Sequence, residues 1–171
     1  HFSGGAADEI TLRANRSAWD TQMLHPRVLC PLAGGHTRVE LLGQTLPHPI
    51  LLAPVAFQRM AHPDGELASA YAAAAQGAGL VLSTQASLPL EIVANAYLSE
   101  KQRGPLWFQL YMQPDRSFTR ELIQRAERAG FEALVLTVDA PSSGARDRER
   151  RAGFRLPEGV FAVNLMGMSN P

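Results

Sequence analysis

The chain has 171 residues, of which 46% are hydrophobic and 19% are charged, which is the composition of a globular protein with one sizeable core. Sixteen basic and sixteen acidic residues give a formal net charge of zero, so no overall charge attracts the chain to nucleic acid or to an anionic membrane. The single cysteine, Cys30, excludes an intrachain disulfide framework, and we expect a buried thiol in a reducing compartment.

Residues 1–48 predict a helix followed by a small hairpin. Helix-forming sequence runs to about Trp19, with acidic residues near its start that suit the helix dipole. Proline and glycine then punctuate the sequence, and the stretch Arg38–Pro47 predicts a hairpin that turns at Gly43–Gln44. We interpret the stretch after the helix as a linker with a hairpin that acts as a lid or plug, and not as a separate domain.

Residues 49–171 alternate strand and helix. Apolar runs that favour β-strands begin near Ile50, Leu80, Trp107 and Leu134, at separations of 30, 27 and 27 residues. Helical patterns fill the intervals, and this alternation predicts a parallel sheet with crossover helices, an α/β fold.

The expected helices have recognisable starts. One begins after Pro63 and continues through an alanine-rich stretch to about Ala78. Ser87 is expected to cap the second helix, and Asp115 or Ser117 to cap the third.

The repeat favours a barrel over a small open sheet. The expected strands are apolar at successive positions, as when both faces are covered, and a repeat near 27 residues fits a TIM (β/α)8 barrel of about 250 residues. Four units cannot close eight strands. We therefore expect about the first four β/α units of a barrel, ending in the loop after strand 4, with the C-terminal half as its partner and with both chain ends as cut ends.

Each expected strand delivers polar groups or exposed backbone at its carboxyl end, where parallel β/α folds place their chemistry. These groups are Pro54–Ala56 after the first strand, Ser83 and Thr84 after the second, Gln109 and Tyr111 after the third, and Thr137 and Asp139 after the fourth. Single strand ends of this kind are common. Four in register predict a polar floor for a flat ligand.

The residues of the loop after the fourth strand, taken alone, are typical of an exposed turn and surface. Asp139 before Ala140–Pro141 is typical of a turn, and Arg146 stands in a run of alternating charge that is typical of a solvated face. A carboxylate directly after an apolar strand needs a partner if it is buried.

Together the motifs resemble those of the FMN-dependent 2-hydroxy acid oxidases and dehydrogenases, which include glycolate oxidase, lactate oxidase, mandelate dehydrogenase and flavocytochrome lactate dehydrogenase. They are Gly4–Glu9, Ala53–Ala56, Ala61–Glu66, Leu82–Thr84, Trp107–Tyr111, Leu136–Pro141, Gly144 and Arg146. They follow the family's order over nearly the whole chain. The resemblance implies oxidation of an L-2-hydroxy acid to the 2-oxo acid by hydride transfer to FMN.

The resemblance also implies residue roles. Backbone at Pro54, Val55 and Ala56 would lie against the flavin ring. The cofactor's polar edge would be bound by Ser83, Gln109 and Thr137. Arg146 and Tyr111 would bind substrate, with the planar guanidinium suited to its carboxylate, and Asp139 would orient a catalytic histidine.

The histidine that matches this role lies in the family's second half, so we expect the fragment alone to be inactive. His1 stands where better-known members have a substrate-contacting tyrosine, which makes it a further candidate substrate contact. The resemblance further implies a homotetramer, no metal, and a cytoplasmic location with membrane association as an alternative.

Two other functions stay open at this point. One is the FMN-dependent isopentenyl diphosphate isomerase reaction, on a diphosphate substrate without net oxidation. The other is a non-catalytic flavin-binding barrel fragment.

Overall fold

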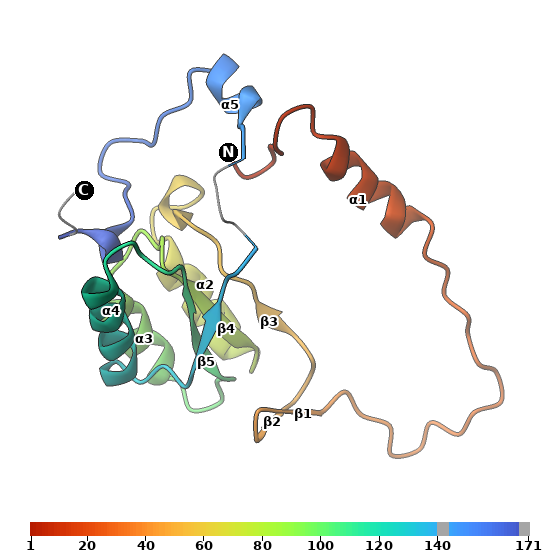
Figure 1. The fold of residues 1–171 in the computed structure, drawn as a ribbon. Helices are drawn as coiled ribbons and strands as arrows, with labels where there is room; N and C mark the ends of the chain where they lie inside the picture. Colours follow the sequence, from red (N-terminus) through yellow and green to blue (C-terminus); the bar gives the residue numbers. More distant parts are fainter. Residues whose placement is uncertain (140–143, 168–171) are drawn as a thin grey trace. The chain divides into compact units, whose positions relative to one another are not determined.

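The computed structural model describes residues 1–139 and 144–167, which form two units (Figure 1). The first unit contains residues 1–35 and 144–155, and the second contains residues 36–139 and 156–167. No helix among these residues is long and apolar enough to cross a membrane.

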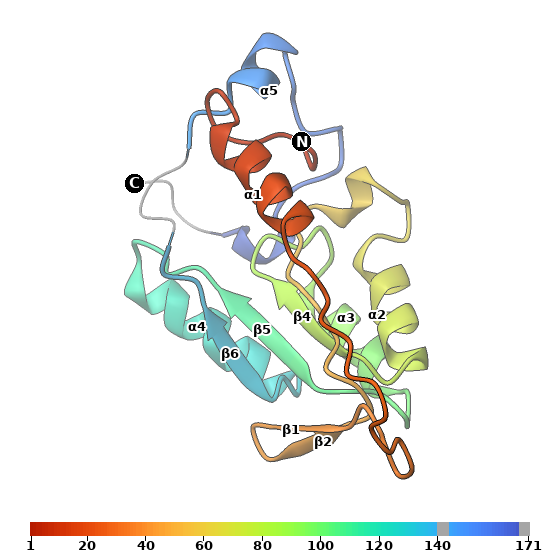
Figure 2. The same cartoon turned by 90° about the vertical axis from the view of Figure 1, so that its right-hand side faces the viewer.

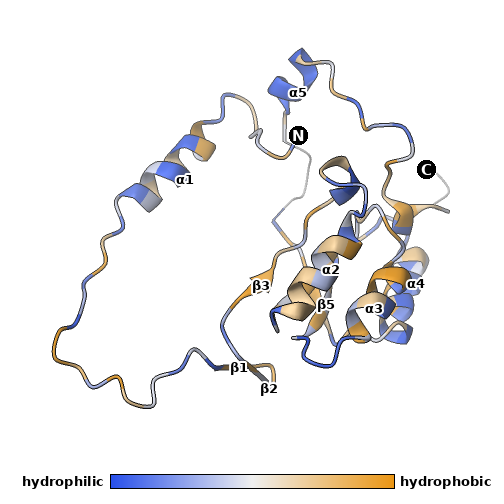
Figure 3. Ribbon diagram, turned by 180° about the vertical axis from the view of Figure 1, so that it is seen from behind, coloured by the Kyte–Doolittle hydropathy of each residue, from blue (hydrophilic) through white to orange (hydrophobic). Residues whose placement is uncertain are grey.

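The first unit has two helices, α1 (Ile10–Asp20) and α5 (Asp147–Arg151). The predicted N-terminal helix is confirmed. Glu9 precedes α1, and its carboxylate accepts a hydrogen bond from the backbone N–H of Gly5 at 3.0 Å. The backbone N–H of Ala7 donates to the Ala145 carbonyl at 2.7 Å, which joins the start of the chain to the α5 region. α5 is hydrophilic along its length (Figure 3).

The prediction of a buried Cys30 is wrong, because Cys30 is exposed. It lies in a stretch, residues 22–35, that forms neither helix nor strand. Among the described residues its sulfur bonds only the Val28 carbonyl, at 3.7 Å, and the adjoining Leu29 is fully exposed.

The second unit is built on a parallel sheet with helices between successive strands (Figure 2). The strand order is β3-β4-β5-β6, and each neighbouring pair is parallel. The strands are β3 (Leu51–Leu52), β4 (Gly79–Ser83), β5 (Leu106–Leu110) and β6 (Ala133–Leu136), and the helices between them are α2 (Glu66–Ala75), α3 (Leu90–Leu98) and α4 (Arg116–Arg128). The predicted α/β alternation is therefore confirmed.

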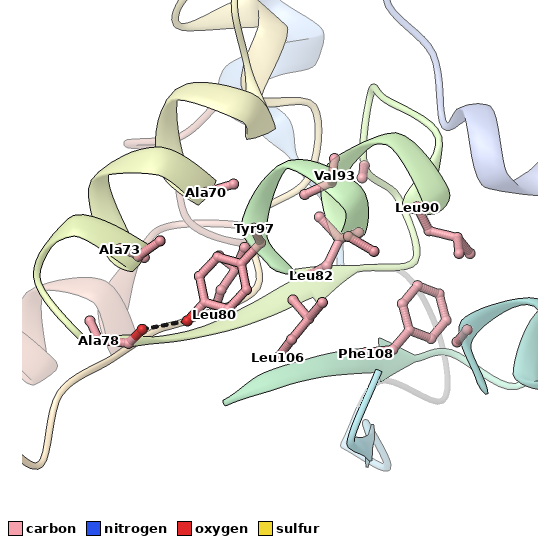
Figure 4. Close-up of a cluster of buried hydrophobic side chains, with 14 of the residues drawn as sticks. Ala70, Ala73, Ala78, Leu80, Leu82, Leu90, Val93, Tyr97, Leu106 and Phe108 are labelled. Carbon is pink, nitrogen blue, oxygen red and sulfur yellow. Dashed lines mark hydrogen bonds between the residues drawn. The ribbon is translucent and has the colours of Figure 1, made fainter. Parts of the chain in front are cut away.

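The core lies between β4, β5 and the helices α2 and α3 (Figure 4). Every residue of β4 is buried, which explains its continuous apolar sequence. β6 differs, because it has a paired neighbour on one side only within the described sheet: Leu134 and Leu136 are 46% and 50% exposed.

The two predicted helix caps have different outcomes. Asp115 caps α4 as expected, accepting from Ser117 N–H at 2.7 Å, and the Ser117 hydroxyl lowers the pKa of this carboxyl. The prediction for Ser87 is wrong, because its hydroxyl donates to Glu66 instead. Asn164 supplies the α3 cap, since its Oδ1 accepts from Leu90 N–H at 2.9 Å. Asn164 lies in a 3-10 turn, η2 (Val163–Leu165).

The predicted hairpin is present as β1 (Val39–Leu41) and β2 (Gln44–Leu46), which pair antiparallel. The turn falls one residue earlier than predicted, at Leu42–Gly43. Both turn residues have positive φ, 49° and 78°, as the twist of a two-residue hairpin requires.

Candidate active site

Three of the predicted polar side chains form a continuous hydrogen-bonded row at the carboxyl ends of β4, β5 and β6. Ser83 Oγ donates to Gln109 Oε1 at 3.3 Å, and Gln109 Nε2 donates to Thr137 Oγ1 at 2.8 Å. Ser83 and Gln109 are register partners of adjacent strands. The parallel sheet thus brings together residues that lie 26 and 28 positions apart in the chain.

Thr84 fixes the side chain of Gln109 from behind this row. Its backbone N–H donates to Gln109 Oε1 at 3.2 Å, and its hydroxyl donates to the Gln109 carbonyl at 2.5 Å. The Tyr111 N–H donates to the same hydroxyl at 3.2 Å. Because the carboxamide oxygen is held by two donors, the amide nitrogen is directed toward Thr137.

The row keeps hydrogen-bonding capacity for a ligand. Within the described chain, the second N–H of the Gln109 amide and the hydroxyl hydrogen of Thr137 have no hydrogen-bond acceptor. A hydroxyl can both donate and accept. The arrangement therefore suits a planar ligand edge on which donors and acceptors alternate.

Beside the row, Pro54, Val55 and Ala56 follow the carboxyl end of β3. Pro54 is exposed and Val55 is 42% exposed, so this segment presents backbone and apolar surface. The Phe57 N–H donates to the Gln85 carbonyl at 3.1 Å, which links the loop after β3 to the loop after β4.

Tyr111 and Asp139 stand at the ends of β5 and β6. Tyr111 is half-buried, and its carbonyl accepts from the Gln113 side chain at 2.8 Å. Asp139 is exposed and forms no hydrogen bond or ion pair with the described part of the chain. The predicted motif Leu136–Pro141 is described as far as Asp139; its last two residues lie outside the described residues.

In the first unit, Arg146 and His1 converge on Glu149. Glu149 Oε1 accepts from Arg146 Nε at 2.8 Å and also from Arg146 Nη2. The same oxygen lies 3.0 Å from His1 Nδ1. The His1 ring stacks on Phe154, with centroids 5.3 Å apart. Two predicted substrate residues are thereby brought together around one carboxylate.

The sequence reasoning overlooked the roles of Glu66 and Asn164. Both are buried, at 1% and 0% exposure. The Ala61–Glu66 motif gives Glu66 no role of its own, and no sequence pattern distinguishes Asn164. The signal available for Glu66 was an acidic residue at the start of an otherwise apolar helix.

The residues around the row fit a flavin. The isoalloxazine ring has a polar edge of alternating carbonyl oxygens and ring nitrogens, which matches the donors and acceptors of Gln109, Ser83 and Thr137. It also has a flat apolar face, which matches the exposed surface at Val55.

The model of one protein family matches residues 1–170, and its description is "FMN-dependent dehydrogenase". The chain is 48% identical over 171 residues to an L-lactate oxidase of Roseobacter sp. (strain GAI101), and 39% identical over 168 residues to glycolate oxidase 3 of Arabidopsis thaliana. These alignments cover 100% and 98% of this chain, but 45% and 44% of the relatives.

Solved structures give the same result. A mandelate oxidase with (S)-2-phenylpropionate superposes with a TM-score of 0.88 at 42% identity, covering 95% of this chain and 47% of that one. A mandelate oxidase variant with a C4a-OH-FMN adduct gives 0.87 at 41% identity, with 95% and 48% coverage. The chain thus spans about half the length of its relatives, and the expected (β/α)8 half barrel is confirmed.

Proposed function

Since the chain belongs to the FMN-dependent dehydrogenase family, we propose that it is the amino-terminal half of an enzyme that oxidises an L-2-hydroxy acid to the 2-oxo acid. The names of the relatives support this class of reaction, because they are L-lactate, glycolate and mandelate oxidases. The observation that carries the proposal is the Ser83–Gln109–Thr137 row at the strand ends.

The row and the neighbouring loop would bind the cofactor. Ser83, Gln109 and Thr137 would bond the polar edge of FMN, and backbone at Pro54–Ala56 would cover part of its ring. When bound, FMN supplies the two-electron acceptor of the reaction. Because Gln109 is fixed by Thr84 before any ligand arrives, little reorganisation would be needed on binding.

The remaining candidates would handle substrate. Arg146 would bind the substrate carboxylate with its planar guanidinium. The family resemblance gives Tyr111 and His1 as further substrate-contact candidates. Asp139, which is exposed at the end of β6, would orient a catalytic histidine from the second half of the barrel and stabilise its protonated form. The base would therefore come from outside this chain, and the half barrel alone would be inactive.

Anaerobic mixing of the full-length protein with L-lactate, glycolate or L-mandelate tests this function. We expect the visible absorbance bands of the bound flavin to disappear and one equivalent of 2-oxo acid to form per flavin. Turnover of isopentenyl diphosphate without bleaching would instead establish the isomerase. A yellow protein that none of these compounds alters would establish a non-catalytic flavin barrel.

We also propose that the C-terminal half of the same chain completes the barrel. The full-length protein would form a homotetramer in the cytoplasm. The family resemblance supports this assembly. Sedimentation of the full-length protein would test it, with a monomer as the contradicting result. Cell fractionation would test the location, and recovery in the membrane fraction would favour the alternative.

A further inference from the structure

Glu66 is a buried carboxylate that neither the predicted cofactor contacts nor the predicted substrate contacts include. It is 1% exposed and has no basic side chain within ion-pair distance in the described structure. Its partners are the N–H of Gln58 at 3.2 Å, the N–H of Ser87 at 2.8 Å and the Ser87 hydroxyl at 2.7 Å. A charge is costly to bury without an opposite charge, so these donors must stabilise it.

The donors come from two different loops. Gln58 lies two residues after Ala56 and begins a 3-10 turn, η1 (Gln58–Met60), in the loop segment that follows β3. Ser87 lies three residues after Thr84, in the loop that follows β4. The Ser87 hydroxyl also accepts from Arg59 N–H at 3.1 Å, so the two loops are joined to each other as well as to Glu66.

The backbone before Glu66 is adapted to this close approach. Gly65 has φ 51° and ψ −128°, a conformation that favours glycine. A Cβ at Gly65 would lie 2.7 Å from Arg59 Cγ. The glycine thus allows the β3 loop to pack directly against the start of α2, where Glu66 also meets the positive end of the helix dipole.

We propose that Glu66 is a positioning residue for FMN, because its carboxylate fixes the loop that carries Pro54–Ala56 relative to the loop that carries Ser83 and Thr84. This inference rests on the proposed function. Glu66 does not touch the ligand; it sets the spacing between the surface that covers the ring and the groups that bond its edge. Loss of the carboxylate should therefore weaken FMN binding as well as loosen the loops.

The test uses Glu66→Gln in the full-length protein, with FMN affinity measured by fluorescence titration of the apoprotein. We expect the Kd for FMN to rise about 10- to 100-fold, the scale set by a lost charge-assisted hydrogen bond. Hydrogen exchange at the Gln58 and Ser87 amides should become faster at the same time. A Kd within about twofold of the wild type would overturn the proposal.

Glu132→Gln is the matched control. The Glu132 carboxylate also accepts a backbone N–H, from Leu106 at 3.3 Å, and bonds Arg103 at 2.7 Å, but it precedes β6 and so lies at the opposite end of the strands. It should lower stability without changing the Kd for FMN. An equal rise in Kd for both variants would show a general loss of stability and overturn the positioning role.

A milder variant covers the case in which Glu66→Gln does not fold. Ser87→Ala removes one donor and keeps the carboxylate, and should raise the Kd about three- to tenfold; an unchanged Kd in this variant counts against the proposal. A wild-type protein that binds no FMN would overturn the proposed function as a whole. If the wild type binds FMN and oxidises 2-hydroxy acids, but the Glu66 and Ser87 variants bind FMN with the wild-type Kd, only the role of Glu66 is overturned.

Discussion

Glu149 accepts two hydrogen bonds from one side of the Arg146 guanidinium. Its Oε1 lies 2.8 Å from Nε and also accepts from Nη2, and Nη2 donates a further bond to the His1 carbonyl at 2.7 Å. Within the described residues, Nη1 makes no hydrogen bond, so a substrate carboxylate could accept from Nη1 while Glu149 and the His1 carbonyl hold the Nε and Nη2 donors. Glu149 thereby fixes the Nε edge of the Arg146 guanidinium.

Replacing Glu149 by Gln in the full-length enzyme should weaken substrate binding. The amide loses the charge that fixes the guanidinium, so we expect kcat/KM for the 2-hydroxy acid to fall about three- to tenfold, mainly through KM. Steady-state kinetics measures this. Asp147→Asn is the control, since it breaks a more exposed pair with Arg150, 3.1 Å apart. Equal effects of the two substitutions would argue against a specific role for Glu149.

Arg146 itself should be far more sensitive. Arg146→Met removes the charge and the planar fork, and kcat/KM should fall by about 100-fold, the cost of hydrogen bonds to a charged partner. Arg146→Lys should restore only part of this loss, because lysine lacks the planar guanidinium whose Nε and Nη2 bond Glu149 and the His1 carbonyl while Nη1 stays available. FMN content should stay normal in both variants. Arg150→Met, on α5, which begins directly after Arg146, should leave the kinetics unaltered; unaltered kinetics in Arg146→Met would remove its assigned role.

Thr137→Val tests the row of polar strand ends. Valine keeps the shape but cannot accept from Gln109 Nε2, which donates at 2.8 Å. We expect the free energy of unfolding to fall by about 1 kcal/mol and the Kd for FMN to rise about three- to tenfold. Thr119→Val is a matched control, because Thr119, on α4, is only 3% exposed and its hydroxyl accepts from the Gln113 backbone N–H at 3.1 Å. Thr119→Val should lower the free energy of unfolding without changing the Kd for FMN. A similar rise in Kd in this variant would contradict the cofactor role of Thr137.

The sequence revealed the row because its pattern repeats. Each buried strand is a continuous apolar run, and parallel strands place their carboxyl ends along one edge. Ser83 and Gln109 could therefore be paired from their spacing, and the structure places them as register partners. The strand expected near Ile50 is present as β3, which spans only Leu51–Leu52.

Contacts between distant residues gave no such pattern. Asn164 caps α3 through a bond to Leu90 across 74 residues, and nothing near Asn164 in the sequence indicates this partner. The helix-capping preference of serine predicts Ser87 as the cap. In the structure the Ser87 hydroxyl instead donates to the buried Glu66 carboxylate, which would otherwise lack this hydrogen bond. Tertiary satisfaction of a buried charge thus overrode a helix-capping preference.

Tyr97 offers a test of the core that does not depend on the cofactor. Its ring is fully buried between α3 and the sheet, and its hydroxyl donates to the Ala78 carbonyl at 2.5 Å (Figure 4). Burial raises the pKa of Tyr97 from 10.0 to about 12, although the Arg103 guanidinium near the ring opposes the shift. The folded protein therefore keeps the phenol proton at pH values where the unfolded chain releases it.

The sign of the resulting pH dependence follows from this raised pKa. The contribution to stability is fully present below pH 10 and is lost as the pH rises toward 12, by up to about 3 kcal/mol. At pH 8, Tyr97→Phe should be less stable than the wild type by about 1 kcal/mol, because the Ala78 carbonyl loses its donor. The order should reverse between pH 10 and 12, since phenylalanine carries no proton to lose.

Urea unfolding of the full-length wild type and Tyr97→Phe from pH 8 to 12 measures the difference in their free energies of unfolding. Groups that titrate in the same way in both proteins do not contribute to this difference. A pH-independent difference in stability between Tyr97→Phe and the wild type would show that the Tyr97 phenol loses its proton at the same pH in the folded and unfolded chains.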